Sequence, residues 1–218
     1  IGQLSATDFG SFTATQFGGL TPTQIGSMTT AALQTLTETT LDGLTTTQIK
    51  GLTATQVGNL ADTQVQSLTE TQIAGLSATQ IKGLETTDLG LLTTTQFSLL
   101  STTQVAAFTT TQVKALADTQ VSGLSTTQLN GLTVTQLNAL ETTDLQALTT
   151  TQIAGLSTTA VKNLTSTQVT DLLDAQAAAL TTTQIAVLSA TQASALDVTD
   201  FAALTTTQLS AFTQTQLG

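Results

Sequence analysis

The side chains best placed for chemistry in this sequence are pairs of carboxylates three positions apart. Glu85 precedes Asp88 and Glu141 precedes Asp144, and residues three apart share one face of a helix. Two adjacent carboxylates can serve as a general acid and a general base. The same spacing is typical of acids in the first turn of a helix, where they interact favourably with the helix dipole. We interpret the two pairs as first-turn acids.

The composition lacks the usual catalytic and metal-binding groups. The 218 residues include no histidine and no cysteine, so the commonest bases, the thiol nucleophiles and most zinc ligands are missing. Calcium takes about six to eight oxygen ligands, and no calcium-loop or phosphate-binding glycine motif is present. We therefore predict no enzymatic activity, no catalytic or metal-binding residue and no cofactor.

Charge and hydropathy restrict the partners. The net charge is −10, from fourteen acids and four lysines without arginine, which gives no basic surface for nucleic acid or anionic lipid. No run of about 18 apolar residues occurs, so we expect no membrane insertion. Because 39% of the residues are hydrophobic, the chain should nevertheless bury a core.

An eight-residue repeat organises the whole sequence. From Leu4 onward the chain divides into octads without insertion or deletion, with the consensus L-T-x-T-Q-[I/V/L/F]-x-small. We number these positions 1 to 8. A continuous α-helix would rotate each octad by about 80° from the one before, so no apolar stripe would persist. The repeat therefore predicts either a short helix or a strand in every octad.

The octad Leu148–Gly155, LTTTQIAG, illustrates why a helix is favoured. Thr149 is a typical N-cap, and Gln152 three residues later completes a capping box. Leu148 and Ile153 occupy the two positions of a hydrophobic staple, and Pro22, the only proline, falls on the first helical position of its own octad. Gly155 at position 8 suits a helix end or a close backbone contact. We predict an all-α solenoid with one helix of about six residues in each octad.

A β-solenoid is the alternative. Thr, Ile and Val favour strands, and Thr149 and Thr151 belong to a T-x-T array that, on a flat sheet, resembles the ice-binding face of antifreeze proteins. In a helical octad we expect the first threonine to cap the helix and the second to pack or hydrogen bond at the turn. Position 6 would point away from position 1 in a strand, which counts against the sheet.

A longer period runs through the octads. Position 2 is Ser or Thr except at six sites, which are separated by three and four octads in alternation, so that the pattern recurs every seven octads. These sites are Ala61, Glu85, Ala117, Glu141, Leu173 and Asp197. One hypothesis is that the solenoid completes a superhelical turn in about 28 residues, so that these six octads line one side as a lateral-contact face. The other is simple duplication of a seven-octad segment.

The L-T-T-T-Q-I-A-G pattern resembles the threonine-rich octapeptide tracts of large bacterial surface or secreted proteins, often adhesin-like. This resemblance implies an extracellular location and a spacer or fibre role, and it implies no site residue. We expect residues 1–218 to form one repeat solenoid, with Ile1 at position 6. Both ends fall within an octad, which suggests an excerpt of a longer array or a filament subunit.

Three functions follow from these observations. The first is a structural protein that self-associates into an extracellular rod, stalk or filament. The second is an ice-binding β-solenoid that uses the T-x-T array. The third is an adhesion or glycan-binding spacer, which the aromatic content of 3% disfavours, since aromatic side chains commonly anchor binding interfaces.

Overall fold

The computed structural model describes residues 4–218, so Ile1, expected at position 6, lies outside the described residues. The chain divides into two compact units, Ile1–Ala115 and Leu116–Gly218. The regular structure of both units consists of short α-helices, one in each octad, none of which reaches two turns. The predicted all-α solenoid is confirmed. The β-solenoid alternative is wrong, since the described residues contain no strand.

The first unit contains helices α1 to α14. Their bounds are α1 Ala6–Gly10, α2 Ala14–Gly18, α3 Pro22–Gly26, α4 Thr30–Gln34, α5 Glu38–Asp42, α6 Thr46–Ile49, α7 Ala54–Val57, α8 Asp62–Ser67, α9 Glu70–Gly75, α10 Ala78–Gly83, α11 Thr86–Leu91, α12 Thr94–Ser98, α13 Thr102–Val105 and α14 Thr110–Lys114.

The second unit contains helices α15 to α27. Their bounds are α15 Asp118–Ser122, α16 Thr126–Gly131, α17 Val134–Leu137, α18 Thr142–Ala147, α19 Thr150–Ala154, α20 Thr158–Lys162, α21 Ser166–Thr170, α22 Asp174–Ala178, α23 Thr182–Ile185, α24 Ala190–Ala193, α25 Val198–Ala203, α26 Thr206–Leu209 and α27 Gln214–Leu217.

Most helices start through a capping box in which threonine or serine and glutamine bond reciprocally. In α19 the Gln152 backbone N–H donates to Thr149 Oγ1 at 3.2 Å, and the Thr149 backbone N–H donates to Gln152 Oε1 at 2.6 Å. Leu148 and Ile153 flank this box and are 3% and 1% exposed. Local chemistry thus fixes where the helix begins, while burial of positions 1 and 6 supplies stability that helices this short lack alone.

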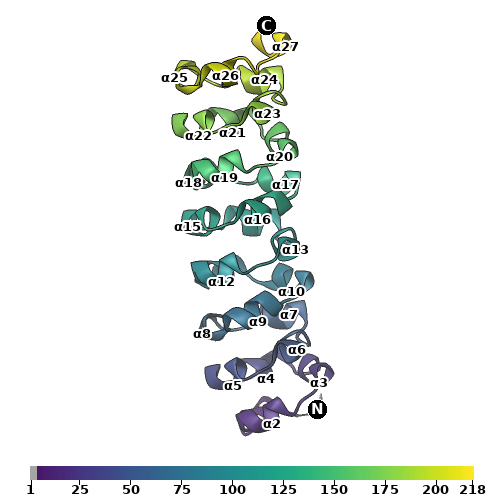
Figure 1. Ribbon diagram of the computed structural model, residues 1–218. Coiled ribbons are helices and arrows are strands. Elements are labelled where there is room, and N and C mark those ends of the chain that lie inside the picture. Colours follow the sequence, from purple (N-terminus) through teal and green to yellow (C-terminus); the bar gives the residue numbers. More distant parts are fainter. Residues whose placement is uncertain (1–3) are drawn as a thin grey trace. The chain divides into compact units, whose positions relative to one another are not determined.

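Within each unit the helices wind into a superhelix whose successive turns stack. In the first unit α8 lies over α5, and α9 packs on α6 (Figure 1). In the second unit α18 packs on α15 and α25 packs on α22. Cross-turn hydrogen bonds join residues 25 to 31 positions apart. One turn therefore takes more than three octads and fewer than four, as the alternating spacing predicts.

Glycine allows the backbones of successive turns to meet at two places in the first unit. A Cβ atom on Gly51 would collide with the main-chain oxygen of Pro22, and one on Gly83 would collide with that of Ala54. The position-8 glycine thus serves close contact, one of its two expected roles. The left-handed helix stop is not used, since Gly218 alone among the described residues has a positive φ.

Candidate functional site

The side chain at position 5, where it is glutamine, joins most helices to the turn below. Gln184 is 1% exposed and its Oε1 accepts from the Thr181 backbone N–H at 2.7 Å. Its Nε2 donates to the main-chain oxygens of Ile153 and Leu156, 31 and 28 residues earlier, both at 2.8 Å. The amide group of Gln184 therefore caps its own helix and also forms hydrogen bonds to two octads of the previous turn.

This arrangement, which we term the glutamine ladder, recurs through both units. In the first unit Gln80 donates to the oxygens of Ile49 and Leu52 at 2.7 and 2.8 Å. In the second unit Gln176 donates to those of Leu145 and Leu148, each at 2.7 Å. The Ile49 and Leu145 oxygens also accept a main-chain N–H, whereas those of Leu52 and Leu148 accept none within the described residues, so the ladder satisfies the latter main-chain groups.

Sequence reasoning assigned glutamine only its capping role. A capping box accepts either Glu or Gln at its last position, yet no octad has Glu at position 5. A carboxylate supplies the acceptor for the cap but has no N–H to donate. The strong preference for glutamine at position 5, with aspartate in only four octads, was the available signal for a donor contact elsewhere.

Two predicted repeat positions remain, those of Thr151 and Gly155. Thr151 is exposed and its side chain makes no hydrogen bond to the described residues, so the expectation that the second threonine packs or bonds at the turn is not met in this octad. Gly155 is the C-cap of α19, with a φ of −87°, and a Cβ there would collide with the Thr126 side chain. The T-x-T residues lie on a helix start and not on a flat sheet.

The six octads with an unusual position 2 start helices that stack on one another. Ala61 and Glu85 precede α8 and α11, which pack together in the first unit. In the second unit Ala117, Glu141, Leu173 and Asp197 precede α15, α18, α22 and α25. There α15 packs on α18 and α22 packs on α25, while Gln176 of α22 bonds to the main chain of α18. We call these helices the marked column of each unit.

The marked columns carry three groups of carboxylates, one in the first unit and two in the second, which we call the acid trios. In the first trio Asp88 of α11 experiences the negative charges of Glu85 and of Asp62 on α8. The same arrangement recurs seven octads later and again after seven more. The other trios are Asp118, Glu141 and Asp144, and Asp174, Asp197 and Asp200.

Burial perturbs one acid in each trio. Asp88, Asp144 and Asp200 are each 3% exposed. Desolvation is the main cause that raises the pKa of all three carboxyls, and the neighbouring acids raise the pKa further. Asp8 occupies the same position 5 but is exposed, and a hydrogen bond from the Ser5 hydroxyl lowers its pKa. The surroundings of each aspartate, and not its position in the repeat, therefore determine whether its pKa is raised or lowered.

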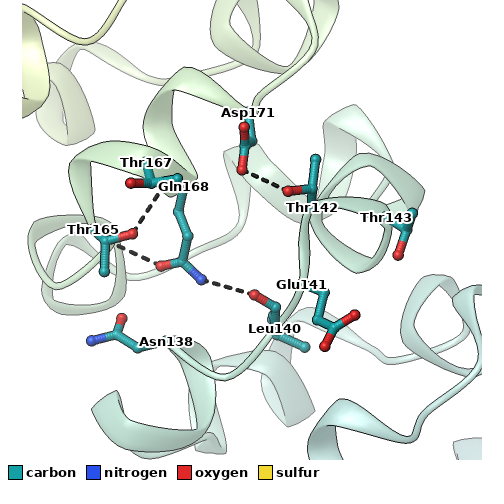
Figure 2. A pocket seen from close by; sticks show the side chains of 9 residues that line it. All are labelled: Asn138, Leu140, Glu141, Thr142, Thr143, Thr165, Thr167, Gln168 and Asp171. Carbon is teal, nitrogen blue, oxygen red and sulfur yellow. Dashed lines mark hydrogen bonds between the residues drawn. The ribbon is translucent and has the colours of Figure 1, made fainter.

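An open groove of about 470 Å³ lies beside the marked column of the second unit (Figure 2). The Thr142 hydroxyl donates to Asp171 across it at 2.7 Å, and Gln168 Nε2 donates to the Leu140 oxygen at 3.3 Å (Figure 2). The lining residues are Asn138, Leu140, Glu141, Thr142, Thr143, Thr165, Thr167, Gln168 and Asp171. Several of its polar groups are thus engaged in cross-turn contacts.

Residues 4–218 contain no group of three or more His, Cys, Asp or Glu side chains with an arrangement that could hold a metal ion. No helix in the described part of the chain is long and apolar enough to cross a membrane.

Comparison with known proteins supports the repeat architecture. The ALTTAQ repeat family matches residues 81–118 and 137–173. Both stretches consist of the octads described above, and the sequence Ala-Leu-Thr-Thr-Thr-Gln at 147–152 differs from the family's six-letter name at one position. No curated protein matches the chain. The chain is a repeat protein whose match to this family covers two separate stretches.

Proposed function

We propose that this chain is a non-enzymatic structural repeat module that acts as a spacer, stalk or filament on the outside of a cell. The observation that carries the proposal is the use of the characteristic side chains within each octad. Positions 2 and 5 close the helix start, position 5 also binds the turn below, and positions 1 and 6 fill the core. The recurring residues of the octad therefore serve to form the helices and to stack successive turns of the solenoid.

The glutamine ladder supports an architecture of variable length. Successive turns donate hydrogen bonds to the turn before them and offer main-chain oxygens to the turn after them. Further octads can add without a new kind of contact, as in other solenoids. The same complementarity supports self-association of copies end to end. The resemblance to octapeptide tracts of bacterial surface proteins supports the extracellular location.

Electron microscopy of purified chains tests the structural role. We expect a chain with twice the number of octads to give particles of about twice the length, because a quasi-one-dimensional solenoid grows only along its axis. Analytical ultracentrifugation over a range of protein concentrations tests self-association. Particles whose length does not increase with octad number would contradict the spacer role.

The location requires a separate experiment in cells that express the chain. Protease added to intact cells should degrade an epitope-tagged chain while a cytoplasmic marker survives. Protection of both proteins would place the chain inside and remove the extracellular part of the proposal, without affecting the measurement of length.

A further inference from the structure

Three buried aspartates interrupt the glutamine ladder at a regular interval. Asp88, Asp144 and Asp200 stand at position 5, where glutamine normally caps its helix and donates to the turn below. Each aspartate keeps the capping role, since the backbone N–H groups of Glu85, Glu141 and Asp197 donate to them at 2.9, 2.8 and 3.0 Å. The ionised carboxylate has no proton with which to perform the second role.

The acceptors that glutamine would satisfy are left without that donor. Glutamine at position 5 donates to the main-chain oxygen 28 residues earlier, which for the aspartates is that of Leu60, Leu116 and Leu172. Among residues 4–218 these three oxygens accept no hydrogen bond. The three leucines are buried. At each site a carboxylate, which can only accept when ionised, therefore stands at the repeat position from which a glutamine amide donates to that oxygen elsewhere in the ladder.

The charges around each aspartate add to this conflict. Asp88 is close to Glu85 on its own helix and Asp62 on α8, while α14, which also packs on α11, contributes Lys114 at its end. The lysine is not among the groups that perturb Asp88.

The second unit repeats this arrangement twice. Asp144 is close to Glu141 and to Asp118 on α15, and Asp200 is close to Asp197 and to Asp174 on α22. Asp171, the C-cap of α21, bonds to Thr142 of the helix that carries Asp144. Negative charges thus dominate the surroundings of all three aspartates.

We propose that Asp88, Asp144 and Asp200 form proton-operated clasps that tighten successive turns of the solenoid when the surroundings become acidic. Protonation gives each carboxyl a donor for the main-chain oxygen below, reached directly or through one water molecule. It also removes one negative charge from each acid trio. When the aspartate is ionised, it makes no hydrogen bond to the turn below, and the clasp is open. When the aspartate binds a proton, it donates that hydrogen bond, and the clasp is closed.

The sign of the effect follows from linkage. The folded state raises the pKa of the three carboxyls above the usual value of 3.8, so the folded chain binds protons more readily than the unfolded chain. The three groups therefore add stability as the pH falls through their folded-state pKa values. Asp8 and Asp197, whose pKa is lowered, act in the opposite direction. The pH dependence of the native chain alone therefore mixes opposing contributions. The informative quantity is the difference in unfolding stability between a variant and the native chain.

Urea unfolding followed by circular dichroism between about pH 7.5 and 4.5, above the isoelectric point of about 4.1, tests the clasps. The test variant combines Asp88→Asn, Asp144→Asn and Asp200→Asn, since asparagine keeps the capping oxygen, adds donors and carries no charge. We expect this variant to have a higher midpoint than the native chain near pH 7.5. The gap should shrink as the pH falls.

A matched control removes three exposed acids outside the acid trios, by Glu38→Gln, Asp42→Asn and Glu70→Gln. We expect its gap from the native chain to depend less on pH. ¹³C NMR of the labelled aspartates adds a direct measurement: the Asp88, Asp144 and Asp200 carboxyls should titrate above 3.8, in the same interval in which the gap shrinks. A constant gap for the asparagine variant, or titration of these carboxyls below 3.8, would overturn the proposal.

Discussion

Replacement of Gln184 by alanine should weaken the contact between two turns more than removal of a helix cap does. The change deletes the Nε2 bonds to Ile153 and Leu156 and the Oε1 contact with the Thr181 N–H. A buried hydrogen bond contributes about 1 kcal/mol net. The two shorter cross-turn bonds and the cap together give a loss of about 3 kcal/mol in the local free energy of unfolding, without the longer contact to the Ala154 oxygen at 3.3 Å.

Two control variants separate the ladder from the cap. Thr181→Ala removes the hydroxyl that accepts from the Gln184 N–H but leaves the ladder, and such a cap loss costs about 1 kcal/mol. Gln24→Ala removes a glutamine whose Oε1 caps α3 and whose Nε2 makes no cross-turn bond within the described residues. We expect about 1 kcal/mol there as well.

Native-state hydrogen exchange is the appropriate assay, because a repeat array need not unfold in one step. Gln184→Ala should lower protection both in α23 and in α19, one turn below, while Thr181→Ala should act mainly on α23. A difference of about 2 kcal/mol corresponds to roughly a 30-fold change in the exchange rate of α19 amides. Equal effects of Gln184→Ala and Thr181→Ala on α19 would refute the role of the ladder.

Three further substitutions test packing and capping. Gly83→Ala forces a methyl group against the main chain of Ala54 and should destabilise by about 1–3 kcal/mol in urea unfolding; Gly90→Ala meets no atom within 4 Å and should be neutral or stabilising by up to about 1 kcal/mol. Ile153→Ala empties a fully buried site and should cost about 2–5 kcal/mol, measured as loss of helical circular dichroism on heating. Thr149→Ala should reduce exchange protection of α19 by about 1 kcal/mol, and no change would contradict its capping role.

The sequence predicted the helix starts because they depend on local contacts. Thr149, Gln152 and Pro22 occupy the predicted cap, N3 and N1 positions, since every partner lies within the same octad. The non-integer turn was visible because the exceptions at position 2 recur alternately after three octads and after four. The observed turn therefore favours the superhelical geometry, over duplication of a seven-octad segment alone, as the origin of that spacing.

The glutamine ladder and the acid trios could not be predicted from the residues of a single octad. The partner of each glutamine amide lies 28 to 31 residues away, so no short motif contains both groups. The pair Glu85 and Asp88 was noticed, but its third member, Asp62, belongs to another octad on the preceding turn. Burial of Asp88 depends likewise on that stacking, and the first-turn interpretation therefore missed the raised pKa.

A turn of about three and a half octads constrains how genes for such arrays can change length. Recombination that adds one octad preserves every capping box and every rung of the ladder, so the fold survives. It nevertheless rotates all later octads by roughly a hundred degrees around the axis. Surface residues after the inserted octad would then no longer align with the equivalent residues before it. Gain or loss of seven octads, two full turns, keeps both fold and surface aligned. Slippage during replication can therefore vary the length freely, whereas a functional face would be inherited only in blocks of seven octads.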